Sequence, residues 1–261
     1  MVDGGVRPLV KTFIWGLSVF RLTGAAVNIV PMPTSRRSVE RIGHRGAPRE
    51  YPENSLPAFA RAIELGADGV ELDVHLTRDG VAVVHHDFHL GGDHGPSRRA
   101  LSGMTWTEAS RHVLAPGVCI PSLEQVLQLV AARATVYVEL KGKDVERAAL
   151  TTIRESDTPC AVHSFDHLAV ARAARIAPEI RRGILFDAYP VDVVRSMRDA
   201  SALDVWPQWE LIDEPLVERV HETGGRIIAW TVNDEATAAN LVALGVDGLC
   251  GDDVRVFSKL P

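Results

Sequence analysis

Cysteine is scarce in this chain of 261 residues, which contains only Cys119, Cys160 and Cys250. Their number is odd, they lie far apart, and no two of them form a CxxC pair. The sequence therefore predicts neither a disulfide framework nor a cysteine-based zinc site. Two of the three lie in apolar runs, where a free cysteine behaves as a small core residue.

An excess of positive charge is also lacking, since the formal net charge is -6. Basic residues do not run beyond pairs such as Arg36 with Arg37 or Arg98 with Arg99. Proteins that bind nucleic acid need a broad positive surface. We therefore expect no nucleic-acid partner.

The third absence is an unbroken apolar run long enough to span a membrane. Residues 12–30 are mostly apolar, but Arg21 divides them into two short pieces, whereas a membrane-spanning helix needs about 20 apolar residues. We favour a membrane-surface anchor, or a leader upstream of a start at Met32, over a signal peptide cleaved near Gly24. Residues 1–39 are thus expected to be a leader or anchor segment that precedes a domain at 40–261. The expected location is cytoplasmic, with membrane association or export as the alternative if the segment is a signal.

From Arg41 onward, short β-branched runs alternate with amphipathic helices, which is typical of parallel βα units. With 46% apolar residues, the chain can bury a large core. Helices are expected near 56–66, 123–130, 144–155, 166–177, 190–200, 213–223 and 234–244. Parallel strands are expected at 41–44, 69–75, 136–140, 160–164, 183–186, 203–206, 226–231 and 246–250.

Eight parallel strands in a chain of this length predict a closed (β/α)8 TIM barrel. The segment 77–80 reads Thr-Arg-Asp-Gly, a turn signature, so residues 81–85 should return as a hairpin on the second strand. Residues 88–118 have no clear period, and we interpret them as a small insertion after that strand. A doubly wound sheet is disfavoured because no GxGxxG follows the first strand.

Histidines and acidic residues that could act in catalysis or metal binding are concentrated in residues 42–87. Six of the ten histidines lie between His44 and His94, both included. Alternation along a strand places Glu71 and Asp73 on one face, and Glu139 with Lys141 on one face of the next parallel strand. A barrel would bring these acids together at its C-terminal mouth. Ionised carboxylates cannot crowd there without a cation, so we expect one divalent metal ion, Mg²⁺ or Ca²⁺.

Two histidines end strands at the same predicted mouth: His44 after the first strand and His86 after the hairpin. Imidazoles titrate near neutral pH, so this pair could serve as base and acid. Arg45 and Lys141 are expected to hold an anionic phosphate, although simple charge pairing with the acids is the alternative. Three further histidines are interpreted as structural, namely His75, His85 and His89.

Several spaced motifs, taken in order, resemble the glycerophosphodiester phosphodiesterase family over residues 41 to about 252. They are Gly-His44-Arg45-Gly, Pro-Glu53-Asn54-Ser, Val-Glu71-Leu-Asp73-Val, Val-His85-His86-Asp87, Pro121-Ser-Leu-Glu, Glu139-Leu-Lys141, Ser164-Phe165-Asp166 and Trp230-Thr-Val-Asn233. The resemblance implies a phosphodiesterase barrel whose divalent metal ion is bound by Glu71, Asp73 and Glu139.

The resemblance also implies roles for other residues. His44 and His86 match the acid/base pair, with His44 favoured as base, and Arg45 and Lys141 match phosphate contacts. Glu53 and Asn54 match a pair that braces the site, and Trp230 matches an aromatic residue that flanks the substrate alcohol.

The chain departs from the family pattern in two places. Phe88 begins a segment unlike the usual Leu-x-Arg-Thr-Thr, which leaves substrate choice open. Gly251 replaces the usual Thr before Asp252, which removes one hydroxyl from the mouth.

The expected reaction is metal-dependent hydrolysis of a small glycerophosphodiester to an alcohol and sn-glycerol 3-phosphate. One alternative is a phosphodiesterase directed at lysophospholipids, with the N-terminal segment as a weak membrane contact. A second is a barrel that binds a phosphorylated ligand without turning it over. The alcohol released and the oligomeric state are left open.

Overall fold

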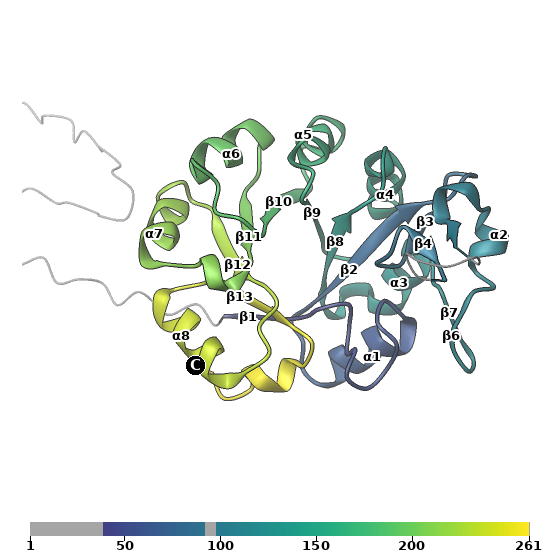
Figure 1. The fold of residues 1–261 in the computed structure, drawn as a ribbon, viewed down its shortest axis with the longest axis horizontal. Helices are drawn as coiled ribbons and strands as arrows, with labels where there is room; N and C mark the ends of the chain where they lie inside the picture. The colour runs from purple at the N-terminus through teal and green to yellow at the C-terminus, as the bar shows by residue number, and fades with distance from the viewer. Residues whose placement is uncertain (1–38, 92–97, 261) are drawn as a thin grey trace, which may run out of the picture. The chain divides into compact units, whose positions relative to one another are not determined.

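The computed structural model describes residues 39–91 and 98–260. In this part of the chain eight parallel strands close into a barrel, because the first strand pairs with both the second and the last (Figure 1). In order around the barrel they are β1 (Glu40–Gly43), β2 (Gly69–Leu76), β8 (Thr135–Leu140), β9 (Cys160–Ser164), β10 (Arg181–Phe186), β11 (Asp204–Pro207), β12 (Arg226–Ala229) and β13 (Gly248–Gly251). The predicted (β/α)8 TIM barrel is confirmed.

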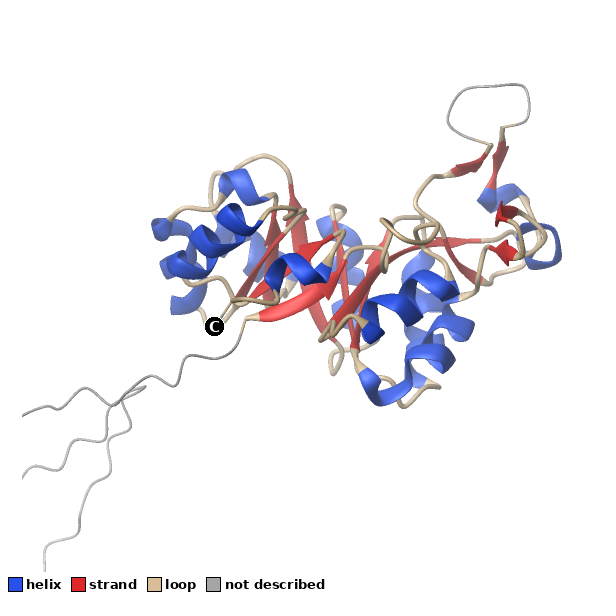
Figure 2. Cartoon of the chain, turned by 90° about the horizontal axis from the view of Figure 1, so that it is seen from below, coloured by secondary structure: helices blue, strands red, loops and turns tan. Residues whose placement is uncertain are grey.

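Helices cover the outside of this barrel (Figures 1 and 2). They are α1 (Leu56–Glu64), α3 (Leu123–Val130), α4 (Val145–Arg154), α5 (His167–Ile176), α6 (Val193–Ala200), α7 (Glu214–Glu222) and α8 (Glu235–Leu244), with short 3-10 turns at η2 (Ala131–Arg133), η3 (Trp209–Leu211) and η4 (Val254–Phe257). The turn η4 stands where an eighth helix would follow β13. Each of these helices agrees with a predicted segment to within a few residues.

Local sequence explains where the helices begin. The Ser55 hydroxyl accepts a hydrogen bond from the backbone of Ala58, and Pro57 lies in the first turn of α1. Ser122 and Gln125 form a reciprocal capping box at the start of α3, as the sequence predicts. Such caps satisfy backbone N–H groups that have no partner within the helix.

The core has two layers. Outward-facing strand residues such as Leu72 and Val138 pack against the helices, and both are completely buried. Inward-facing residues fill the barrel interior, where Tyr137, Trp206 and Ile228 belong to one cluster. The interior is therefore packed rather than hollow, and an open cavity can form only near its ends.

Between β2 and α3 the chain makes an excursion from the barrel. Its first strand, β3 (Ala82–Val84), pairs antiparallel with β2 as a hairpin. Short elements follow: β4 (His89–Leu90), β5 (Arg99–Ala100), η1 (Leu101–Gly103), α2 (Trp106–Ala109), β6 (Val113–Ala115) and β7 (Val118–Cys119). A separate apolar cluster that includes Val83, Leu101 and Ile120 holds them together, and they extend beyond the ring of helices (Figure 2).

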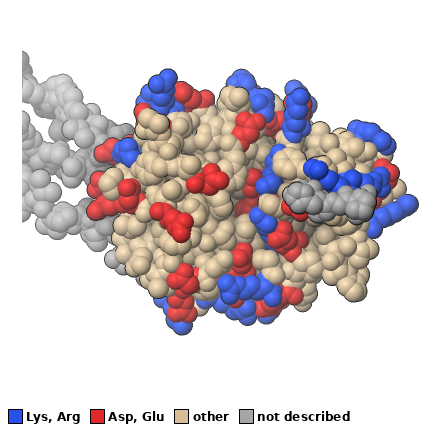
Figure 3. Space-filling model, in the orientation of Figure 1, with Lys and Arg blue, Asp and Glu red and all other residues tan. Residues whose placement is uncertain are grey.

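Residues 1–38 of the predicted leader or anchor segment, including Met32, lie outside the described residues. Within residues 39–91 and 98–260, no helix is both long and apolar enough to cross a membrane. On the face drawn in Figure 3, acidic and basic side chains are interspersed among broad neutral areas.

Candidate active site

A cavity of about 240 Å³ opens where the barrel strands end. Seven of the residues predicted from sequence line it, namely His44, Arg45, Glu71, His86, Glu139, Lys141 and Trp230. Residues that the sequence analysis did not single out complete the lining, among them His163, Leu185 and Trp206. Barrel closure thus brings together residues from opposite ends of the chain.

The acids come from two neighbouring strands. Glu71 and Asp73 project from β2 and Glu139 from β8, and all three are buried. Burial, with the nearby charge of Asp73, raises the pKa of Glu139 to about 8. With its pKa raised that far, Glu139 keeps its proton near neutral pH, so the three carboxylates can all be ionised only if a further cation lies beside them. Asp73 Oδ1 is also buried without a hydrogen-bond partner. The residues therefore fit a divalent metal ion.

Asp73 lies among cations and an amide. Arg45 Nε is 3.2 Å from its Oδ2 and Lys141 Nζ is 3.4 Å from its Oδ1. Asn54 Nδ2 donates to Oδ2 at 2.7 Å, and the backbone N–H of Asp73 donates back to Asn54 Oδ1. Burial alone would raise the pKa of Asp73, but the charges of Arg45 and Lys141 outweigh it and hold that pKa below its ordinary value.

The two predicted phosphate-binding cations are paired with acids in the structure. Besides Asp73, Arg45 contacts Glu53 through Nη1 at 3.0 Å, and Lys141 contacts Glu139 at 3.3 Å. Both cations nevertheless line the cavity. An anionic ligand would therefore share them with the acids rather than meet them free.

The loop after β1 needs an unusual backbone. Arg45, Gly46 and Asn54 all have positive φ, a region that costs non-glycine residues energy. At Gly46 a Cβ atom would approach Ala58 to within 2.7–2.9 Å, so only glycine fits against α1. The backbone N–H of Asn54 donates to the carbonyl of Arg45. This hydrogen bond links the end of the loop to Arg45, whose side chain lines the cavity.

Each candidate acid/base histidine has a carboxylate behind it. His44 Nδ1 is 2.8 Å from Asp252 Oδ1, and His86 Nδ1 is 2.8 Å from Asp87 Oδ1. Because carboxylates only accept hydrogen bonds when ionised, each Nδ1 is the donor and each Nε2 is left for chemistry. Burial alone would lower the pKa of His44, but the hydrogen bond with Asp252 and the charge of Glu71 raise it above its ordinary value.

The sequence analysis mentions Asp252 only because Gly251, the residue before it, replaces a threonine. It does not predict the contact between Asp252 and His44. Asn233 fixes Asp252 by a pair of hydrogen bonds, from Asn233 Nδ2 to Asp252 Oδ2 and from the Asp252 backbone to Asn233 Oδ1. A Cβ at Gly251 would collide with the carbonyl of Val232. Local packing therefore explains why a glycine stands where the family usually has threonine.

Aromatic side chains form the other side of the cavity. The indole of Trp230 donates to the carbonyl of Trp206 at 2.8 Å. The ring of Phe165 meets that of Trp230 edge to face, with centroids 5.5 Å apart. A ligand in this cavity would therefore meet charge on one side and an apolar surface on the other.

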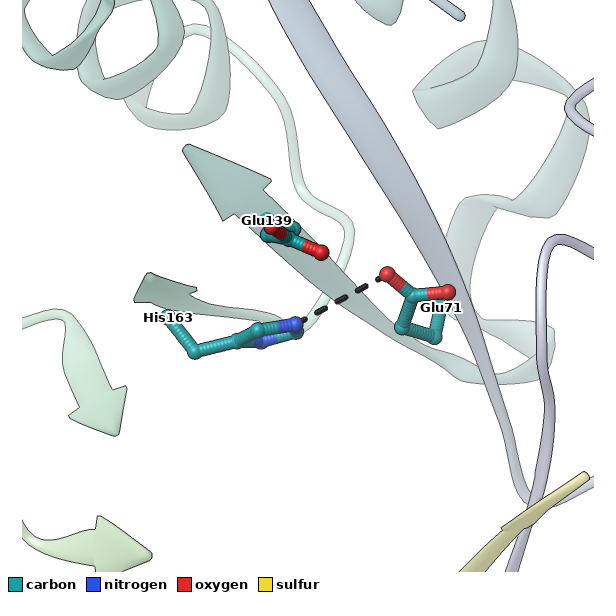
Figure 4. A group of neighbouring side chains, drawn as sticks. All are labelled: Glu71, Glu139 and His163. Atoms are coloured by element: carbon teal, nitrogen blue, oxygen red, sulfur yellow. Dashed lines mark ion pairs between the residues drawn. The ribbon is translucent and has the colours of Figure 1, made fainter. Parts of the chain in front are cut away.

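His163 is the main functional candidate that sequence reasoning missed. It projects from β9, and one oxygen or nitrogen atom from each of Glu71, Glu139 and His163 falls within 4.8 Å of the others (Figure 4). One signal was present, because alternation places His163 on the same strand face as Ala161, opposite to Val162. Only the paired register, which sets Glu139 beside His163, identifies that face as the inner one.

The three histidines interpreted as structural do not line the cavity. His75 Nε2 contacts the carbonyl of His86 at 3.0 Å, and burial lowers the pKas of His75 and His85. His89 lies in β4 of the excursion and contacts Arg98.

The fold and the site together define a (β/α)8-barrel enzyme with paired histidines beside a cluster of acids and cations. The chain belongs to the glycerophosphoryl diester phosphodiesterase family, whose model matches residues 44–256. The resemblance seen in the sequence is thus confirmed, and the protein is a phosphodiester hydrolase of this family.

Individual relatives agree with this assignment. A glycerophosphodiester phosphodiesterase from Caldanaerobacter subterraneus subsp. tengcongensis is 30% identical over 233 residues, which cover 84% of this chain and 96% of that protein. The crystal structure of a glycerophosphodiester phosphodiesterase from Thermotoga maritima is 28% identical, with a TM-score of 0.72 over 85% of this chain and 98% of that one.

A third relative shares the fold. It is a phosphodiesterase from Oleispira antarctica in complex with the product sn-glycerol-3-phosphate, 24% identical, with a TM-score of 0.78 over 84% of this chain and 95% of that one.

Proposed function

We propose that this protein hydrolyses small glycerophosphodiesters to an alcohol and sn-glycerol 3-phosphate with the help of a divalent metal ion. The observation that carries the proposal is the pair of carboxylate-backed histidines in one cavity with the acid cluster. A binding protein needs the cations but not two imidazoles that carboxylates hold with Nε2 free. The Oleispira relative, whose structure contains sn-glycerol-3-phosphate, supports the product class.

In the proposed mechanism, His44 Nε2 takes a proton from the nucleophile, which is water or a neighbouring hydroxyl of the substrate. Attack by that hydroxyl forms a cyclic phosphate, which one water molecule then opens to sn-glycerol 3-phosphate. Asp252 holds His44 in the tautomer with Nε2 free. His86, held by Asp87, donates a proton to the leaving alkoxide. Positioned acid and base groups of this kind typically contribute about 10²- to 10⁴-fold in rate.

Charge on the phosphoryl oxygens is met by Arg45 and Lys141, which line the cavity on the side of the acids. Glu71, Asp73 and Glu139 are the proposed ligands of one Mg²⁺ or Ca²⁺, and oxygen ligands suit both ions. When bound there, the ion supplies further neutralisation of phosphoryl charge. Trp230 and Phe165 contribute an apolar surface for the carbon atoms of the alcohol.

The first test replaces the histidines one at a time. We expect His44→Ala and His86→Ala to lose about 10²-fold or more in turnover of glycerophosphocholine, with unchanged circular dichroism. His85→Ala serves as a matched control, because that imidazole does not line the cavity. Release of sn-glycerol 3-phosphate can be followed by a coupled dehydrogenase assay. Wild-type turnover in either cavity variant would refute the assignment.

The metal is tested separately. We expect excess chelator to abolish turnover, Mg²⁺ or Ca²⁺ to restore it, and Glu71→Gln to need more metal than the wild type. Full activity in excess chelator would remove the metal from the mechanism. Phosphate binding without turnover under every metal condition would favour the non-catalytic barrel.

A second candidate, a lysophospholipid-directed phosphodiesterase, is favoured by exposed apolar side chains after the strand ends. Phe88 follows β3, Phe165 and Leu168 follow β9, and Tyr189 and Val191 follow β10. All five are exposed, and Leu168 and Val191 are 71% and 105% exposed. Apolar side chains around a cavity mouth suit a lipid surface.

Micelles of lysophosphatidylcholine and soluble glycerophosphocholine, each offered to the chain with and without residues 1–31, separate the two candidates. The first candidate predicts faster turnover of the soluble substrate and no effect of the truncation. For this candidate we propose a cytoplasmic location. Faster turnover of micelles that falls on truncation would favour the second.

A further inference from the structure

His163 is buried in a way that its protein neighbours do not explain. The residue is 1% exposed, and neither Nδ1 nor Nε2 has a hydrogen-bond partner. A neutral imidazole has one donor and one acceptor, and leaving such groups buried without partners costs about 1–3 kcal/mol each. A buried polar ring that lines a cavity and makes no hydrogen bond points to a ligand in that cavity.

The ring is also held in one orientation. It stacks on Trp206 with centroids 4.4 Å apart and planes 18° apart. In this orientation the ring points toward Glu71, and the dashed line in Figure 4 marks the contact between them. Nε2 lies 3.7 Å from Glu71 Oε1. That separation is too long for a hydrogen bond.

The same separation suits two atoms that share one cation. Ligand atoms that each lie about 2.1 Å from an ion are roughly 3 to 4.2 Å apart, and the 3.7 Å between Glu71 and His163 falls in that range. The Glu139 carboxylate lies within 4.8 Å of both. One cation between them would give Nε2 the partner that it lacks and would neutralise two buried carboxylates.

We infer that His163 is a nitrogen ligand of the metal ion, in addition to the carboxylates of the proposed function, on which this inference rests. An imidazole ligand favours Mn²⁺, Co²⁺ and Zn²⁺, whereas Mg²⁺ and Ca²⁺ prefer oxygen. The site therefore binds the softer ions more tightly than Mg²⁺ or Ca²⁺. Because no acceptor supports Nδ1, His163 is a weaker ligand than a carboxylate-backed histidine would be.

The test measures metal binding rather than turnover. The full-length apo protein is titrated with Mn²⁺, Co²⁺ and Ca²⁺ by calorimetry, and the bound Mn²⁺ is then probed by pulsed electron paramagnetic resonance for coupling to ¹⁴N. His163→Phe keeps a ring against Trp206 and removes both nitrogens. His163→Gln is the second variant, and His221→Gln, which alters a surface histidine paired with Asp247, is the control.

For the wild type and the control we expect tighter binding of Mn²⁺ and Co²⁺ than of Ca²⁺, with a ¹⁴N coupling. In both His163 variants the affinity for Mn²⁺ and Co²⁺ should fall about 10-fold or more, the coupling should disappear, and Ca²⁺ binding should be nearly unchanged. Retained Ca²⁺ binding also shows that the variants are folded around the acids.

Four results would overturn the inference. One is a ¹⁴N coupling that persists in the His163 variants and disappears in His44→Gln, which would make His44 the nitrogen ligand. Another is that the His163 variants lose the same affinity for every ion while the wild type shows no ¹⁴N coupling. That result would mean that His163 only positions Glu71. Absence of metal binding by the wild type would refute the proposed metal site together with the inference, whereas normal binding in all variants would refute the inference alone.

Discussion

At the scale of single residues, the partner of each histidine matters as much as the histidine itself. His44 and Asp252 are 208 positions apart in the chain, yet their side chains are hydrogen-bonded. Glu71 on the other side raises the pKa of His44 further, and Arg45 opposes it. Asp252 is therefore a positioning residue that sets both the tautomer and the basicity of His44.

This arrangement predicts a shift of the pH profile in Asp252→Asn. A general base works in its neutral form, so the acidic limb of kcat/KM lies at the pKa of His44. Because Asp252 raises that pKa, its neutralisation should lower the pKa and move the limb to lower pH. Loss of the correct tautomer should also reduce maximal kcat by roughly 10²-fold or more.

The pH profile separates this role from a purely structural one. Asp253→Asn is the matched control, because Asp253 contacts Arg255 instead of a histidine and should leave the limb in place. An Asp252→Asn enzyme that keeps the wild-type limb would show that Asp252 does not control His44.

At the scale of elements, the loop from His44 to Ser55 joins β1 to α1 and also holds β2. Asn54 is completely buried, has a φ of 55°, and makes two hydrogen bonds with Asp73. The conformation of the loop and the position of the acid are therefore coupled through one side chain.

Two substitutions at Asn54 separate these contributions. Asn54→Gly loses the hydrogen bonds but tolerates the positive φ, and should lower the free energy of unfolding by about 1–3 kcal/mol. Asn54→Ala adds the strain of a left-handed backbone and should cost roughly 1 kcal/mol more. Urea unfolding measures both. If the two variants proved equally stable, the backbone at this position would carry no strain.

The strands and helices were predictable from sequence to a large extent, because their signals are local. Ser122 and Gln125 mark the start of α3, and Thr77 to Gly80 mark the hairpin, before any tertiary contact is known. Element ends were less predictable. The strand expected to reach Thr231 ends at Ala229, where the chain turns to place Trp230 against Trp206.

At the scale of the whole molecule, the two ends of the barrel have different tasks. The cavity lies where the strands end, whereas the first residues of several strands form a charge network at the opposite end. Arg226 contacts Glu40 at 3.0 Å, Asp204 at 3.1 Å and the hydroxyl of Tyr137 at 3.2 Å. Arg181 also pairs with Asp204, which is almost fully buried.

Arg226→Met should therefore reduce stability without changing catalysis. Removal of one partner from a buried ion pair costs about 3–5 kcal/mol. Because Arg226 is partly exposed and Asp204 keeps Arg181, we expect a loss of roughly 2–3 kcal/mol. Denaturant unfolding should show this loss, while kcat/KM at 25 °C should stay within about 2-fold, since the network is remote from the cavity. A large fall in kcat/KM of the folded variant would contradict this division.

Local patterns in the sequence were enough to predict the alternation of strands and helices and most of the residues proposed to act in catalysis. Periodicity, caps and turn residues act over a few positions, so they can be interpreted without the fold. Glu71, Asp73 and Glu139 could be assigned to one mouth because strand alternation and barrel topology are simple rules.

The contacts between polar groups, in contrast, follow from how the barrel closes. Pairing of β13 with β1 brings Asp252 to His44, and the register of β8 with β9 brings His163 beside Glu139. The same closure shows that Arg45 and Lys141 are already paired with acids. Such contacts depend on side-chain direction and strand register across the whole barrel, which no local pattern specifies.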